Sequence, residues 1–202
     1  MHMRHNFFAD EPTTLMLGIG RHNEPVPMFE DLFVQALKEE LSVMYLHTAT
    51  NQIGALSING IFKPSDIHGG RESAVSEAEI ADNVLMIYNL FTEIHRCLNL
   101  FEKYDVDNMF DIKAISVDKS HRKKGLAKAL ISASLDVAEC CRMKVVKTEG
   151  TSAYSQKAFQ DAGFKTVWER NYSAFLCENG DPVFMPVDPH VSLKIMTKIL
   201  SE

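Results

Sequence analysis

The chain has 202 residues, 46% of them hydrophobic and 24% charged, and its formal net charge at pH 7 is −6. This length and hydrophobic content are enough for one domain with a full hydrophobic core. The acidic balance and the lack of long basic runs argue against a nucleic-acid-binding protein, which needs a broad positive face. The sequence shows no signal-peptide pattern and no apolar run long enough to span a bilayer. We therefore expect neither a nucleic acid nor a membrane among its partners.

The four cysteines indicate a reducing environment. Cys97, Cys140, Cys141 and Cys177 show neither metal-ligand spacing nor the pattern of a disulfide framework. Disulfides persist mainly in oxidising compartments, so cysteines of this kind predict reduced thiols in a cytoplasmic protein without a metal site. The adjacent Cys140 and Cys141 fit packing on a helix better than redox chemistry.

The first half of the chain predicts helices around a hairpin. Two apolar, β-branched runs flank the turn-like residues 49–52, which predicts an antiparallel hairpin. Apolar residues at helical spacing between 84 and 104 predict one long helix. In chain order, the predicted elements are a helix at 1–8, an amphipathic helix at 29–40, strands at 42–48 and 53–62, a loop at 63–76 and a helix at 84–104.

The second half alternates strands with helices. The predicted elements are a strand at 110–117, a helix at 126–140, a strand at 143–148, a helix at 152–162, and strands at 164–172 and 191–200. The last segment is short and alternates in polarity, which favours a strand, although its apolar spacing also allows a helix. Strand–helix alternation of this kind indicates a mixed sheet with helices on both faces.

A basic turn with a glycine joins the first of these strands to its helix. It is the run RKKGLA at 122–127. The first amides of a helix have no partner inside the helix, and the helix dipole favours negative charge there. Gly125 has no side chain to keep a phosphate away from the backbone, and Arg122, Lys123 and Lys124 add positive charge. The turn therefore predicts a site for the phosphates of one small ligand; the alternative is a solvated basic turn.

The spacing of Arg122, Gly125 and Ala127 resembles the pyrophosphate-binding motif of the GCN5-related N-acetyltransferases. The strand and helix that follow, and Gly163-Phe164 at the next junction, occur in the order typical of that family. A narrower resemblance covers nearly the whole chain: it is similar to the insect-type arylalkylamine N-acetyltransferases, which include dopamine N-acetyltransferases. The segments that carry it are FFADEP at 7–12, ISVD at 115–118, Tyr154-Ser155 and PHV at 189–191.

This resemblance implies an α/β fold, mixed α+β in character, with a single acetyltransferase domain over residues 1–202. The family's fold has a mixed, largely antiparallel central sheet with splayed strands and helices on both faces. Its members normally begin with a strand before their first helix, and no such strand is predicted here. We therefore expect the first strand of the fold to be missing or truncated.

The resemblance also implies acetyl-CoA as the cofactor. In the family, the strand before the phosphate turn separates from its neighbour and the pantetheine arm fills the gap. Ser152 lies where many members have an asparagine that contacts pantetheine, and its alternative role is to cap the following helix. The residues expected to hold the cofactor, Ile115 and Val117 by their backbone, are Ile115, Val117, Arg122, Lys123, Lys124, Gly125, Leu126, Ala127 and Ser152.

Amine acetylation needs a neutral amine, and alkylamines have a pKa of about 10, so a base must accept a proton. By resemblance Glu11 is that base, whereas the sequence alone also fits a surface acid that ends a helix before Pro12. Ser155 matches one of two catalytic serines of the family, and Thr151 occupies the position of the other. Phe159 stands where many acetyltransferases place a tyrosine acid, and a phenyl ring cannot donate a proton.

The predicted function is transfer of the acetyl group of acetyl-CoA to the primary amine of a small arylalkylamine such as dopamine, serotonin or tryptamine, by a monomer. Tyr154 and His190 are candidates to contact the amine, and each also fits a packing role. The alternatives are the same chemistry on a polyamine, histamine or a protein lysine, and a non-catalytic acyl-CoA-binding module. An acidic pocket would favour polyamines and an aromatic one arylalkylamines. The aromatic candidates are Phe7, Phe8, Phe29, Phe33 and Phe62.

Overall fold

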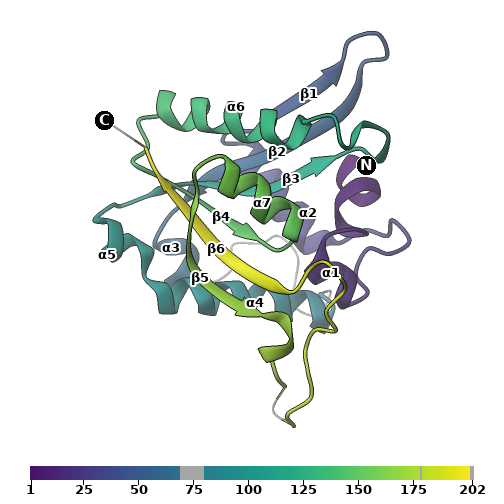
Figure 1. Ribbon diagram of the computed structural model, residues 1–202, viewed down its shortest axis with the longest axis vertical. Helices are drawn as coiled ribbons and strands as arrows, with labels where there is room; N and C mark the ends of the chain where they lie inside the picture. The colour runs from purple at the N-terminus through teal and green to yellow at the C-terminus, as the bar shows by residue number, and fades with distance from the viewer. Residues whose placement is uncertain (69–79, 178, 201–202) are drawn as a thin grey trace.

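Six strands form the central sheet. The computed structural model describes residues 1–68, 80–177 and 179–200. The strand order is β1-β2-β3-β4-β6-β5 (Figure 1). The strands are β1 (Val43–His47), β2 (Gln52–Phe62), β3 (Met109–Val117), β4 (Val145–Gly150), β5 (Lys165–Asn171) and β6 (Ser192–Ile199). β3 and β4 are parallel and the other neighbouring pairs are antiparallel, which confirms the predicted mixed, largely antiparallel sheet.

The last apolar segment, for which a helix was the alternative, is strand β6. It pairs with β4 on one side and with β5 on the other. Most of its residues are buried on both faces of the sheet. This position explains why the polar residues Ser192 and Thr197 are buried together with Leu193, Ile195 and Met196, because a central strand is covered on both faces.

Helices cover both faces of this sheet (Figure 1). They are α1 (Pro12–Met16), α2 (Pro27–Leu37), α3 (Ser65–His68), α4 (Asp82–Leu98), α5 (Leu100–Tyr104), α6 (Leu126–Cys140) and α7 (Ala153–Asp161), with a π-helical turn at Arg4–Phe8. α6 and α7 pack over a core that includes Phe110 and Val146. α4 and α5 pack over a second core, on Phe62 and Val145. Among the described residues, no helix is both long and apolar enough to cross a membrane.

The prediction of one helix over 84–104 is wrong, because the helix breaks at Asn99. The φ of Asn99 is 40°, a left-handed conformation that asparagine adopts more readily than most residues. Its amide donates to the carbonyl of His95 and closes α4. Leu98 and Leu100, on either side of the break, belong to the same core. The apolar spacing therefore continues through the break and gave no sign of it.

The amino-terminal part differs from its prediction in several places. The helix predicted at 1–8 is a short π-helical turn, and α1 was not predicted. α2 begins earlier than expected, at Pro27, since proline suits the first position of a helix. Within the loop predicted at 63–76, α3 forms a short helix, and residues 69–76 lie outside the described residues. β1 is the first strand among the described residues.

β3 and β4 separate toward their carboxyl ends. They pair at only three positions, the last of which is Ile112 with Thr148. Beyond these positions, β3 pairs with β2 and β4 pairs with β6. A bulge in β3 at Lys113, where the register with β2 shifts, lies next to the point of separation. The splayed strands predicted from the resemblance are therefore present.

Candidate active site

A cavity of about 1480 Å³ lies at the gap between β3 and β4. Its walls come from the amino-terminal turns, α2, α4, the ends of β3 and β4, the turn before α6 and the start of α7. The predicted site residues that line it are Glu11, Ile115, Val117, Arg122, Lys123, Gly125, Leu126, Ala127, Thr151, Ser152, Tyr154, Ser155 and His190. Of the predicted residues, only Lys124 is not part of this lining.

The predicted phosphate turn has a backbone that suits an anion. Gly125 (φ 79°) is the capping residue of α6, and Lys123 (φ 61°) is also left-handed. A side chain added at Gly125 would meet no atom within 4 Å, so the space above the helix start is open. The first amides of α6 have no partner inside the helix. An open helix start with these amides fits a pyrophosphate group.

Asp118 organises the approach to this turn. Its Oδ1 accepts hydrogen bonds from the Ser120 hydroxyl (2.5 Å) and the Ser120 amide (2.9 Å). These bonds lower the pKa of Asp118 to about 2, so its carboxylate stays ionised. It therefore holds the short turn Lys119–His121 in place before the basic residues begin.

Arg122 is paired with an acid of the amino-terminal segment. Its Nη2 lies 2.6 Å from Asp10 Oδ2, and its Nε donates to the carbonyl of Val117 (3.2 Å). Lys119 Nζ lies 3.5 Å from the second Asp10 oxygen. Because Asp10 directly precedes Glu11, these ion pairs tie the phosphate turn to the segment that carries the candidate base.

Glu11 is buried at the start of α1. It is 9% exposed, and its Oε2 accepts hydrogen bonds from the Thr13 hydroxyl (2.6 Å) and the Thr14 amide (2.8 Å). Glu11 thus caps the helix that begins at Pro12. The alternative prediction of a surface acid that ends a helix is wrong, since Glu11 is buried and begins one. Its Oε1 is buried without a hydrogen-bond partner among the described residues, so one oxygen remains available to a ligand.

Two further side chains interact with Glu11 electrostatically. Tyr172 is fully buried, and its hydroxyl donates to the carbonyl of Thr151 (2.7 Å). Burial and the Glu11 carboxylate raise the pKa of Tyr172, which keeps its proton. His190 Nδ1 accepts from the Ala153 amide (3.1 Å), and burial lowers its pKa although Glu11 opposes this. Sequence reasoning identified His190 but missed Tyr172, because a tyrosine after a strand carries no distinguishing pattern.

Ser152 and Ser155 hold each other at the start of α7. Ser152 Oγ accepts from the Ser155 amide (3.0 Å), and Ser155 Oγ accepts from the Ser152 amide (3.3 Å), which makes a capping box. The Ser155 hydroxyl donates to the Ser152 carbonyl (3.0 Å). The capping role considered for Ser152 is therefore confirmed, and both residues line the cavity.

The other residues predicted around α7 have different environments. Thr151 precedes the capping residue, so it lies outside the helix. Phe159 is 2% exposed and packs edge-on against Phe164, with ring centroids 5.0 Å apart, so it is a core residue. Tyr154 is mostly exposed, and its ring meets His190 edge-on at 5.3 Å.

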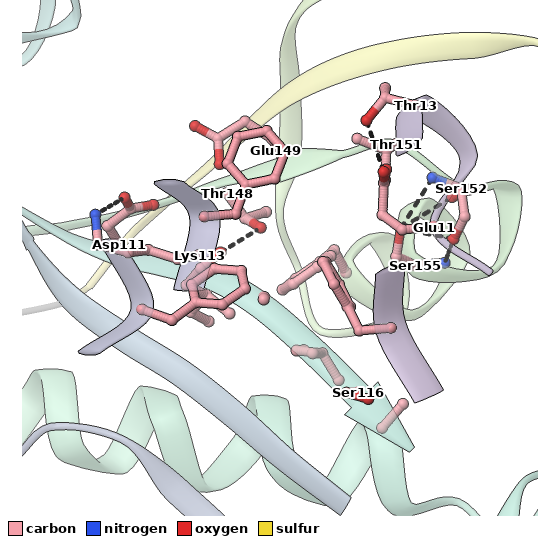
Figure 2. A pocket seen from close by; sticks show the side chains of 18 of the residues that line it. Glu11, Thr13, Asp111, Lys113, Ser116, Thr148, Glu149, Thr151, Ser152 and Ser155 are labelled. Carbon is pink, nitrogen blue, oxygen red and sulfur yellow. Dashed lines mark hydrogen bonds and ion pairs between the residues drawn. The ribbon is translucent and has the colours of Figure 1, made fainter. Parts of the chain in front are cut away.

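Sequence reasoning missed a group of charged side chains in the same cavity. His95, Asp111, Lys113, Lys147 and Glu149 all line it, and we call them the charged cluster. In Figure 2, the labelled members of this cluster lie on one side of the pocket, whereas Glu11 and Ser155 lie on the other. The signal was present in the sequence: charges occupy alternate positions of two strands, and alternate positions share one face.

The cluster combines two carboxylates with two ammonium groups. Lys147 Nζ lies 3.0 Å from Asp111 Oδ1 and forms an ion pair with Glu149, and Lys113 Nζ lies 2.8 Å from Asp111 Oδ2. His95 Nε2 lies 2.6 Å from Glu149 Oε1. Burial and the Lys147 ammonium lower the pKa of His95, which favours the neutral ring. Among the described residues, no three His, Cys, Asp or Glu side chains are arranged to hold a metal ion.

Comparison with known proteins agrees with this geometry. A family profile described as "Acetyltransferase (GNAT) domain" matches residues 103–177. The solved structure of arylalkylamine N-acetyltransferase 2 from Aedes aegypti is 33% identical, covers 99% of this chain and 92% of its own, and superposes with a TM-score of 0.87.

Two further structures share the fold at lower identity. They are mosquito arylalkylamine N-acetyltransferase like 5b, with 19% identity, 98% and 92% coverage and a TM-score of 0.85, and a Drosophila melanogaster polyamine N-acetyltransferase that forms N-acetylagmatine, with 19% identity, 98% and 91% coverage and a TM-score of 0.83. The resemblance to the insect arylalkylamine N-acetyltransferases is confirmed over almost the whole chain by the first of the three. The chain belongs to the GCN5-related N-acetyltransferase family and is an acetyltransferase.

Proposed function

We propose that this acetyltransferase transfers the acetyl group of acetyl-CoA to the primary amine of a small arylalkylamine. The observation that carries the proposal is the pairing of aromatic walls with one buried carboxylate, Glu11, for which residues 1–68, 80–177 and 179–200 supply no cation partner. Such a chamber suits an amine with one positive charge and an aromatic body. Aromatic residues of the cavity lining include Phe7, Phe8, Phe29, Phe33, Phe62, Tyr88 and Phe91.

The pairing of the acidic side chains in the cavity favours one binding position for an ammonium group. Asp111 and Glu149 are paired with lysines, and Asp10 is paired with Arg122. Among the described residues of the lining, Glu11 is the buried acid that forms no ion pair, and its Oε1 is unpartnered. A buried carboxylate of this kind attracts an ammonium strongly, because the low-dielectric surroundings screen it little.

The gap between β3 and β4 fits the cofactor. Acetyl-CoA, when bound, supplies a thioester whose carbonyl carbon bonds to the amine nitrogen as the carbon–sulfur bond breaks. We assign the pyrophosphate to the open helix start at Lys123, Gly125, Leu126 and Ala127, and the pantetheine arm to the backbone of Ile115 and Val117. These two residues lie in the part of β3 that has no pairing with β4. The Arg122 guanidinium is already paired with Asp10, so it would have to bind that carboxylate and a phosphate at the same time.

Glu11 has the geometry for a general base. Two neutral donors hold Oε2, so Oε1 can accept the proton of the amine, directly or through a water molecule. The proton taken from the nitrogen thus leaves for Glu11, while the departing thiolate needs a donor. We assign to the Ser155 hydroxyl a hydrogen bond to that thiolate: the hydroxyl now donates to the Ser152 carbonyl and can redirect its hydrogen by rotating while it keeps its proton. The proton on Glu11 then passes to the thiolate through solvent, which gives the thiol of CoA and restores the base.

The four cysteines support the predicted cytoplasmic setting. Cys97, Cys140, Cys141 and Cys177 are all exposed and free of disulfides. Exposed thiols persist where the compartment keeps them reduced.

A steady-state assay with acetyl-CoA and a panel of amines tests the function. The panel contains phenethylamine, tryptamine, dopamine, histamine, spermidine and a lysine peptide, with release of CoA as the readout. We expect kcat/KM to be highest for an arylalkylamine. A higher kcat/KM for spermidine, histamine or the peptide would show that the acceptor belongs to that class of amine instead. CoA binding without turnover on any amine would identify the protein as an acyl-CoA-binding module.

A further inference from the structure

Lys147 places an ammonium group inside the sheet, in the wall of the cavity. It is 1% exposed and belongs to β4. Its Nζ contacts Asp111 and Glu149 and lies 4.4 Å from the centre of the Phe62 ring. The same Nζ lies 3.3 Å from His95 Nε2. Lysine is rarely buried to this extent.

A gain in folding stability does not explain why Lys147 is buried. Removing an ammonium and two carboxylates from water costs several kcal/mol per ion, and replacing buried ion pairs by apolar residues is often neutral or stabilising. The neighbouring β4 residues Val145 and Val146 show that this part of the sheet accepts apolar side chains. Lys147 lines the cavity, so a role toward a ligand there would account for its burial.

The surroundings of Nζ have the chemistry of a site for an alkylammonium ligand. Two carboxylates provide charge, and the face of an aromatic ring provides a cation–π contact. The Lys147 ion pair with Asp111 is a charge contact, because no residue in the described part of the chain donates an aligned hydrogen bond to Asp111 Oδ1. An ammonium from another molecule would find the same partners if the lysine were absent.

We propose that Lys147 is a specificity-determining residue: it occupies, as an internal cation, the place where the second ammonium of a diamine would bind. The inference rests on the proposed function, because it requires an amine acceptor in this cavity. With Lys147 in place, the carboxylates of Asp111 and Glu149 are compensated, and Glu11 remains to attract one ammonium. The chamber therefore selects amines with one positive charge and excludes diamines and polyamines.

Replacement of Lys147 by a neutral residue tests this assignment. Lys147→Met and Lys147→Gln expose the two carboxylates, and Lys147→Arg keeps a cation as the matched control. Lys113→Met is a second control, because Lys113 also pairs with Asp111 but is partly exposed. The probes are diaminobutane, diaminohexane and diaminooctane, each with the monoamine of the same length, and phenethylamine.

We expect Lys147→Met or Lys147→Gln to bind one of the diamines about 10- to 100-fold more tightly than the wild type does, as expected for one charged hydrogen-bond site. Calorimetry in the presence of CoA measures this binding without turnover. In the assay, the ratio of kcat/KM for that diamine to kcat/KM for phenethylamine rises by a similar factor. The diamine length that responds best reports the separation of Glu11 from the charged cluster. Neither control should show the gain.

Folded Lys147→Met and Lys147→Gln proteins without any gain in diamine binding would overturn the inference. If neither variant folds, calorimetry on the wild-type protein tests the inference. We expect it to bind a monoamine at least about tenfold more tightly than the diamine of the same length. Equal affinity for the two would overturn the inference. A wild type that acetylates no amine would sink the proposed function alone, since the calorimetric comparison still reports whether removal of Lys147 creates a cation site.

Discussion

Buried carboxylates have different partners on the two sides of the cavity. On one side, Glu11 is held by a hydroxyl and an amide, and none of the residues that the structure describes forms an ion pair with it. On the other side, lysines compensate Asp111 and Glu149. The residue types are the same, so the difference lies in their surroundings.

The comparison shows that the partners of a buried carboxylate determine whether its charge can act on a ligand. A carboxylate that only neutral donors hold keeps its negative charge available to a ligand. A carboxylate paired with a lysine has its charge cancelled inside the protein, and it contributes to the shape and polarity of the wall instead. The following experiments test whether the two sides act in these separate ways.

The largest effect is expected from Gly125→Asp, which should remove measurable CoA binding. Gly125 has φ 79° at the start of α6, and aspartate there adds both a side chain and a negative charge where we place the pyrophosphate. Calorimetry with CoA measures the effect. Gly180→Asp is a matched control, because Gly180 is also left-handed (φ 87°) with open space around it, yet lies outside the cavity lining. A folded Gly125→Asp protein with normal CoA affinity would refute the assignment of the turn.

Glu11→Ala should lower kcat by about 10²- to 10⁴-fold, as loss of a general base does. The loss should shrink at high pH, where more of the amine is already neutral. Glu39→Ala is the control, because Glu39 lines the same cavity but is exposed. A pH–rate profile of each variant is the measurement. Full activity of Glu11→Ala at neutral pH would leave Glu11 as a helix cap only.

Ser155→Ala should lower kcat by about 10²-fold, the lower end of the range for acid–base groups. The affinity for acetyl-CoA should stay nearly unchanged, because the donor acts mainly on the leaving thiolate. Ser152→Ala separates this role from helix capping, since it disrupts the same capping box but keeps the Ser155 hydroxyl. Normal turnover with weaker cofactor binding in Ser155→Ala would instead make Ser155 a cofactor contact.

The smallest expected effect is a gradual loss of stability in acid through the charged cluster. The folded protein lowers the pKa of His95 from its ordinary 6.5, so the unfolded chain takes up a proton first. This contribution is complete above pH 6.5 and is lost as the pH falls toward the lowered value. The lowered pKa of Glu149 acts in the same direction below its ordinary 4.5. Denaturant unfolding at a series of pH values measures both stages.

His95→Gln isolates the first of these stages. Glutamine keeps a donor for Glu149 but does not titrate, so the decline that begins near pH 6.5 should disappear while the later one persists. An unchanged pH profile in His95→Gln would show that burial of His95 does not control stability in this range.

Local patterns in the sequence predicted a large part of the fold. The hairpin of β1 and β2, the alternation from β3 to β5 and the phosphate turn at 122–127 all depend on residues close together in the chain. Side-chain periodicity and the conformational freedom of Gly125 act over a few residues, so a single sequence can show them. The break at Asn99 was missed because one asparagine in a left-handed conformation leaves the apolar spacing on both sides unchanged.

The sequence by itself determined the six strands, the helices α2, α6 and α7, their order and the chemical types available to the site. Only the tertiary structure decided that Glu11 is buried, that Asp10 meets Arg122 and that Lys147 lies between Asp111 and Glu149. These outcomes depend on contacts between segments that are far apart in the chain, and on the splay of β3 from β4. Burial and charge pairing are properties of the packed molecule, because the local dielectric and the neighbours of a carboxylate exist only once those segments meet.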